Sequence, residues 1–235
     1  MSKSHLTSDE VRKAVLTRGT LYRLLARGFS MEVDEPFLEW LLKLQPVIAD
    51  LADGSESEEF KEGSRLMGEF VGTVKSDYER DKHQFLQRLA VEYATLFLSV
   101  GQKPVHTSES VYLGKDHLLY EEPYFDAVRI YQIYGFKKRS SFREPEDHIS
   151  IELEFMAHLC DLAALSIEQG KEDYAVGYLK NQKEFLESHL AKWTPELYKK
   201  LKWATKNDFY LALGSLLDGF VSTERSFVPH LAEAL

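Results

Sequence analysis

The sequence has little cysteine, glycine or proline. A single cysteine, Cys160, excludes a disulfide within the chain and a zinc site built from several thiolates. The 13 glycines and 7 prolines are few for 235 residues, which favours long helices over a turn-rich β architecture. Because Cys160 falls on an apolar helical stripe, we expect a small buried thiol and not a nucleophile.

Long apolar runs are also missing. No segment approaches the uninterrupted length needed to cross a bilayer, so no integral membrane segment is expected. Residues 1–10 are polar and lack the apolar stretch of a signal peptide. These two absences predict a cytoplasmic protein.

Basic residues are in deficit. The chain has 29 Lys and Arg against 38 Asp and Glu, a formal net charge of −9. Nucleic acid is therefore not expected as a partner, because phosphate binding needs a basic face. Hydrophobic residues at 44% and charged residues at 29% are ordinary for a globular protein. We expect one domain spanning residues 1–235, with a possible hinge near residues 137–147.

The familiar enzyme motifs are absent. The sequence contains no GxxxxGK[ST] phosphate loop, no GxGxxG, no HExxH and no GxSxG, so the protein is expected not to be an enzyme. Glu154 with His158, and His148 with Glu152, stand four residues apart and could hold a metal ion. Polar pairs on a helix surface explain this spacing equally well, so no metal site is predicted. A metal-dependent helical enzyme is kept as an alternative.

Apolar residues recur at steps of three and four along most of the chain, which predicts an all-α fold of about ten helices. Gly135 is a typical helix terminator, Thr194-Pro195 is typical of a helix start, and a short tail helix is expected near Pro229. Residues 101–122 lack this periodicity and are expected to form a long ordered loop. The expected helices cover residues 8–29, 35–53, 58–70, 81–100, 123–134, 148–168, 171–190, 195–204 and 207–220.

The turn at residues 142–149 is the most informative segment. Pro145 fixes its own φ and pushes Glu144 away from helical geometry, so a helix can begin only after this stiff turn. Asp147 and His148 then fall at the first turn of that helix. A carboxylate is favoured there, so Asp147 could simply be the N-cap, whereas a histidine there is unusual.

Several motifs occur together with this turn. Glu144-Pro145-Glu146-Asp147-His148, followed by Glu152-Leu153, resembles the E-P-x-D-H-x-x-x-E-[LF] signature of the TorD/DmsD/NarJ family of redox-enzyme maturation chaperones. Stretches similar to the same family occur in the same order at residues 92–97, 110–119, 185–195 and 209–213. The likeness extends to the helix that carries Leu21 and Tyr22, and so covers most of the chain.

The resemblance implies a TorD-like helical fold and a chaperone that catalyses nothing. Members of this family bind the twin-arginine leader of a molybdopterin oxidoreductase and hold the apo catalytic subunit in the cytoplasm until its cofactor is loaded. Carried over by position, the leader-binding residues are expected to be Asp147 and His148, with a further set as neighbours. These neighbours are Glu144, Pro145, Glu146, Tyr22, Ser110 and Tyr112.

One position departs from the family pattern. Close DmsD-type members carry Trp-Gly just before the Ser-Val of the 110–113 stretch, whereas this chain has Ser108-Glu109, so its client cannot be inferred. Guanine nucleotide binding has been proposed for some members, and the basic run at residues 137–139 could contact a phosphate. A nucleotide-binding regulatory protein is therefore a second alternative. The resemblance allows either a monomer or a domain-swapped dimer.

Overall fold

Helix α1 (Ser8–Ser30) begins where the sequence predicts it, after a capping box at Thr7. In this computed structural model, which describes residues 6–98 and 100–235, the Thr7 hydroxyl accepts from the Glu10 N–H at 3.3 Å. The Glu10 carboxylate accepts from the Thr7 N–H at 2.8 Å. Asp34, Asp81 and Asn207 cap three further helices through their side chains. Local capping chemistry therefore sets several helix starts.

The remaining helices confirm the predicted all-α fold. Within the described ranges there is no β-strand, and the β-type pairing is a single isolated bridge between Ser108 and His148. The elements after α1 are α2 (Glu35–Asp53), α3 (Glu58–Arg80), α4 (Lys82–Phe97), α5 (Ser110–Leu113), α6 (Glu122–Ile133), α7 (Ile149–Glu168), α8 (Glu172–Phe185), the π-helical turn η1 (Leu186–Leu190), α9 (Ala191–Ala204) and α10 (Asp208–Glu233).

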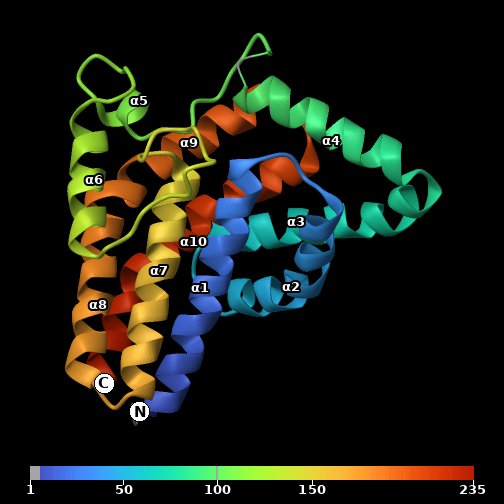
Figure 1. Cartoon of the computed structure of the whole chain (residues 1–235). Coiled ribbons are helices and arrows are strands. Elements are labelled where there is room, and N and C mark those ends of the chain that lie inside the picture. Colours follow the sequence, from blue (N-terminus) through green and yellow to red (C-terminus); the bar gives the residue numbers. More distant parts are fainter. Residues whose placement is uncertain (1–5, 99) are drawn as a thin grey trace.

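Helices α1, α7, α8 and α10 form the central bundle, with α2 and α3 on one side and α5 and α6 at the other (Figure 1). Helix α7 is buried along most of its length between α1 and α8. Helix α3 crosses α10 at very short range, because a Cβ at Gly63 would lie 2.5 Å from the backbone nitrogen of Leu216. Glycine at position 63 is what permits this close approach.

The predicted helix start at Thr194-Pro195 is wrong. The chain stays helical from α8 through η1 into α9, so Pro195 lies inside a helix and Thr194 is buried without capping it. Proline lacks the N–H of a regular helical bond, and the preceding π-helical turn changes the hydrogen-bond register just before it. Thr194-Pro195 is typical of a helix start, but here the pair is part of a buried segment that stays helical.

The separate tail helix predicted near Pro229 is also wrong, because α10 runs unbroken to Glu233. The expected helix over residues 207–220 therefore continues through residues 221–233. In the structure Glu224 of that stretch is buried and pairs with Arg18, while Val228 and Leu231 continue the apolar face. Among the described residues, no helix is long and apolar enough to cross a membrane.

Candidate functional site

The acidic turn and the 107–113 segment are joined by hydrogen bonds. The Ile149 N–H donates to the Thr107 carbonyl at 2.7 Å, and the Glu109 N–H donates to the Asp147 carbonyl at 2.9 Å. The Asp147 carboxylate accepts from the backbone N–H of Ser110 at 2.8 Å and also from its hydroxyl. Asp147 is fully buried, and burial raises the pKa of its carboxyl although the bonds to Ser110 oppose this. Two of the sequence motifs therefore meet at Asp147.

His148, and not Asp147, is the N-cap of α7. Its Nδ1 accepts from the Ser150 N–H at 3.1 Å, and its ring packs edge to face against Phe142 at 5.3 Å. The side chain is buried, and this burial, with a smaller effect of the Lys138 charge, lowers the pKa of His148 to about 3. His148 is therefore a neutral imidazole at physiological pH.

The rest of the turn divides into buried and exposed residues. Pro145 is buried, Glu144 is exposed, and Glu146 is half-buried and forms an ion pair with Lys138 at 3.4 Å. Lys138 also donates to the backbone carbonyl of Glu144. The Glu144 carboxylate is therefore exposed to solvent, while buried Pro145 and the contacts of Lys138 fix the backbone of the turn.

A hollow of about 320 Å³, which we call the acidic groove, opens beside Glu144. Two exposed carboxylates, Glu32 and Glu144, line it together with apolar and aromatic side chains. Burial, then the charges of Glu144 and Glu32, raise the pKa of the Tyr93 hydroxyl to about 12, so both carboxylates lie near this ring. The other lining residues are Ser30, Met31, Phe97, Leu98, Thr107, Phe142, Arg143 and His148.

A larger cleft of about 860 Å³, which we call the apolar cleft, adjoins the acidic groove. The two hollows share Ser30, Met31 and Phe142. Aromatic and aliphatic side chains of α2, α7 and the segment after α6 line the cleft together with charged side chains. The charged lining residues are Arg23, Arg27, Asp34, Arg139, Glu154 and Asp161. The apolar members are Met31, Pro36, Phe37, Trp40, Phe136, Phe142 and Ile151.

The structure does not bring Tyr22 to this region. Tyr22 is fully buried, its hydroxyl donates to Glu224 at 2.8 Å, and its ring packs against Phe220 at 4.8 Å. Ser110 is also fully buried, whereas Tyr112 is half-buried and its hydroxyl donates to the His106 carbonyl at 2.7 Å. A role in leader binding stays a prediction for each of these residues.

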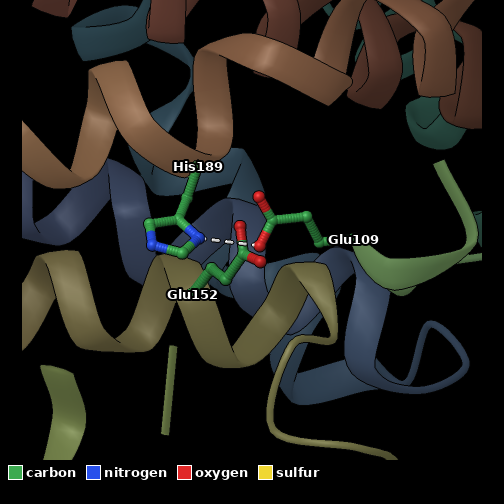
Figure 2. Close-up of side chains that lie close together, drawn as sticks. All are labelled: Glu109, Glu152 and His189. Carbon is green, nitrogen blue, oxygen red and sulfur yellow. Dashed lines mark hydrogen bonds and ion pairs between the residues drawn. The ribbon is translucent and has the colours of Figure 1, made fainter. Parts of the chain in front are cut away.

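Three further buried residues meet below the acidic turn (Figure 2). His189 Nδ1 lies 2.8 Å from Glu109 Oε2, and Trp193 Nε1 donates to Glu152 Oε2 at 3.1 Å. Glu109, Glu152 and His189 are 1%, 0% and 4% exposed. Burial, then the charges of Glu109 and Asp147, raise the pKa of Glu152 well above its usual range. We call Glu109, Asp147, Glu152 and His189 the acidic cluster.

Sequence spacing did not identify this cluster. Glu152 and His189 lie in motifs that carry the family resemblance, but Glu109 stood out only as a departure from the family pattern. The histidines of the two pairs considered from the sequence have other contacts: His158 Nε2 lies 3.3 Å from the Tyr134 carbonyl, and His148 caps α7. The signal that could have found part of the cluster is that Glu152 and His189 belong to motifs shared with the family.

The chain is similar in sequence to a known protein family. The sequence model of the nitrate reductase delta subunit family matches residues 54–199, which is well over half of the chain. The chain belongs to the TorD/NarJ family. This match covers both the acidic turn and the acidic cluster, and it confirms the family predicted from the motifs.

Relatives with curated descriptions agree with this membership. A protein described as "Chaperone protein TorD" from Photobacterium profundum is 29% identical over 170 residues, which cover 72% of this chain and 75% of the relative. A chaperone TorD of Vibrio parahaemolyticus is 23% identical over 220 residues, covering 94% and 98%. A crystal structure of a putative redox enzyme maturation protein from Archaeoglobus fulgidus shares 22% identity, with a TM-score of 0.43 over 91% of this chain and 93% of that one. The curated relatives of this TorD/NarJ family member are named as chaperones.

Proposed function

We propose that this protein is a system-specific redox-enzyme maturation chaperone that binds the twin-arginine leader of a molybdopterin oxidoreductase in the acidic groove and the apolar cleft. The observation that carries this proposal is the position of Glu32 and Glu144 beside a partly apolar hollow. A guanidinium fork binds carboxylates through two parallel hydrogen bonds. Two exposed carboxylates therefore suit a pair of arginines.

The apolar part of such a leader requires a second surface. The apolar cleft adjoins the acidic groove and offers the partly or largely exposed side chains of Met31, Trp40 and Phe142. An apolar helical segment that follows the two arginines would lie in this cleft, in the manner of a helix in a hydrophobic groove. The continuity of the two hollows at Met31 and Phe142 makes one bound peptide sufficient for both.

In this proposal the buried residues of the turn act indirectly. Asp147 fixes the 107–113 segment through Ser110, and His148 fixes the start of α7. Both keep Glu144 at the edge of the acidic groove. Holding the apo catalytic subunit during cofactor loading is the cellular role that this leader binding would serve.

Calorimetry with a synthetic twin-arginine leader tests the proposal. We expect micromolar or tighter affinity, about −8 kcal/mol or better, that weakens at least tenfold in Glu32→Gln/Glu144→Gln. Replacing the two arginines of the leader by lysines should also weaken binding, because lysine cannot form the bidentate contact. The matched control is Glu168→Gln, which removes an exposed carboxylate at the far end of α7. Equal affinity of the double variant and the control would reject the acidic groove as the leader site.

A further inference from the structure

The acidic cluster places three ligand atoms at the junction of three separate segments. Glu109 comes from the segment before α5, Glu152 from the first turn of α7 and His189 from η1 (Figure 2). One ligand atom from each lies within 4.8 Å of the other two, and all three side chains are buried. Figure 2 shows the Glu152 carboxylate next to the direct contact between the His189 imidazole and the Glu109 carboxylate.

Two oxygens here lack a hydrogen-bond partner. Glu152 Oε1 and Asp147 Oδ1 are fully buried and accept no hydrogen bond from the described part of the chain. A buried carboxylate oxygen without a donor is costly, and it is usually explained by a proton, a water or an ion. Glu109 and Glu152 also repel each other when both are ionised, so the cluster needs positive charge that its single imidazole does not fully supply.

We propose that Glu109, Glu152 and His189 bind one divalent transition-metal cation, with Zn²⁺ as the best match. Two carboxylates and one imidazole form a mixed oxygen and nitrogen set that zinc accepts, whereas calcium and magnesium require more oxygen ligands. Ligands about 2 Å from zinc lie roughly 3.3 Å apart in a tetrahedron. The 2.8 Å between His189 Nδ1 and Glu109 Oε2 is close to this spacing, and a Glu152 oxygen lies within 4.8 Å of both atoms.

All three ligand side chains are buried, so a bound cation would be enclosed by the protein. A cation here ties the 107–113 segment, the start of α7 and the η1 turn together directly beneath the acidic turn. The proposal does not depend on leader binding.

Zinc titration of tag-free, EDTA-treated protein tests the site. We expect one equivalent of Zn²⁺ bound with micromolar or tighter affinity, and a higher Tm when zinc is present. Glu152→Gln and Glu109→Gln should each lower the affinity at least tenfold and abolish the rise in Tm. Glutamine mimics the protonated carboxyl, so both variants are expected to fold, which circular dichroism checks.

The matched control is Glu154→Gln/His158→Gln, which removes the partly exposed pair one turn further along α7 and should leave zinc binding unchanged. If either cluster variant fails to fold, Co²⁺ added to the wild-type protein supplies a second measurement. Strong visible absorption then indicates a site of few ligands that includes nitrogen, and a spectrum like that of aqueous Co²⁺ rejects it. No binding to the wild-type protein, or binding lost in the control instead of the cluster variants, would overturn the proposal.

Discussion

The interior holds two groups of charged side chains, and they differ in how far their charges cancel. In the first, Arg18 of α1 donates from Nε to both carboxylate oxygens of Glu224 on α10, at 2.8 and 2.7 Å. Arg18 also donates to Gln182 at 2.6 Å, and Tyr22 donates to Glu224. We call these four residues the arginine cluster. One positive and one negative charge meet there with bidentate geometry.

The acidic cluster instead combines three carboxyls with one imidazole, so its charges do not cancel. Both clusters connect segments that are far apart in the sequence, by 206 residues for Arg18 and Glu224 and by 80 for Glu109 and His189. The comparison indicates that the arginine cluster is a fixed link between helices. The acidic cluster depends on protons or a cation, so its stability can respond to the medium.

The largest expected effect comes from breaking the arginine cluster. Arg18→Met should lower the free energy of unfolding by about 3–5 kcal/mol, because Glu224 is then a buried charge without a partner. The double variant Arg18→Met/Glu224→Met should recover most of this loss, since no lone charge remains. Urea denaturation measures both variants. Losses that simply add in the double variant would mean that the ion pair does not link the two helices.

A smaller effect is expected at Asp147, where the acidic turn meets Ser110. Asp147→Ala should cost about 1.5–3 kcal/mol of stability, because a buried backbone donor and a hydroxyl lose their acceptor. Asp147→Asn keeps an acceptor and should cost much less. Leader affinity distinguishes the two possible roles: Asp147→Asn should bind the leader normally if the residue only positions the turn. A tenfold loss of affinity in Asp147→Asn, with stability retained, would show a direct charge contact.

The pH dependence of stability gives a third prediction. The folded-state pKa of His148 is about 3 against an ordinary value of 6.5, so the unfolded chain takes up a proton that the folded chain does not. Stability from this group is therefore lost as the pH falls below about 6.5, and the loss reaches about 2 kcal/mol at pH 5. His148→Asn keeps an N-cap acceptor without this titration. Chemical denaturation at pH 7 and pH 5 should show a smaller drop for the variant, and equal drops would contradict the buried neutral imidazole.

Helix caps that depend on neighbouring residues could be predicted from the sequence, whereas contacts between residues far apart in the sequence could not. Capping at Thr7 and Asp34 follows from neighbouring residues, and the structure confirms the helices that start there. Asp147 could be read from the sequence as an N-cap because it stands near the start of α7, but its carboxylate is occupied by Ser110, which is 37 residues away. No spacing rule predicts such a contact, and His148 becomes the cap instead.

The arginine cluster and the acidic cluster could not be predicted from the sequence for the same reason. Glu224 lies beyond the predicted end of the last long helix at about residue 220, and it is buried in an ion pair with Arg18. Tyr22 was placed beside the leader site by resemblance, yet its hydroxyl belongs to the arginine cluster. Periodicity identifies which residues are buried in an apolar core, but partners between buried polar residues depend on how the helices pack.

The smallest expected effect is the pH dependence of stability that Glu152 contributes. It tests most directly whether the acidic cluster and the arginine cluster differ in charge balance. Burial and the neighbouring carboxylates raise the folded-state pKa of Glu152 above its ordinary value of 4.5, so the folded chain holds a proton that the unfolded chain releases. This contribution to stability is complete below the unfolded pKa and is lost as the pH rises toward the folded pKa. Glu152→Gln removes the titration while keeping the shape. In EDTA-containing buffer, the stability of the wild-type protein relative to this variant should fall from pH 5 to pH 8, whereas Glu168→Gln should follow the wild type. A constant difference between the wild type and Glu152→Gln would mean that Glu152 is ionised in the folded protein and that the acidic cluster balances its charge as the arginine cluster does.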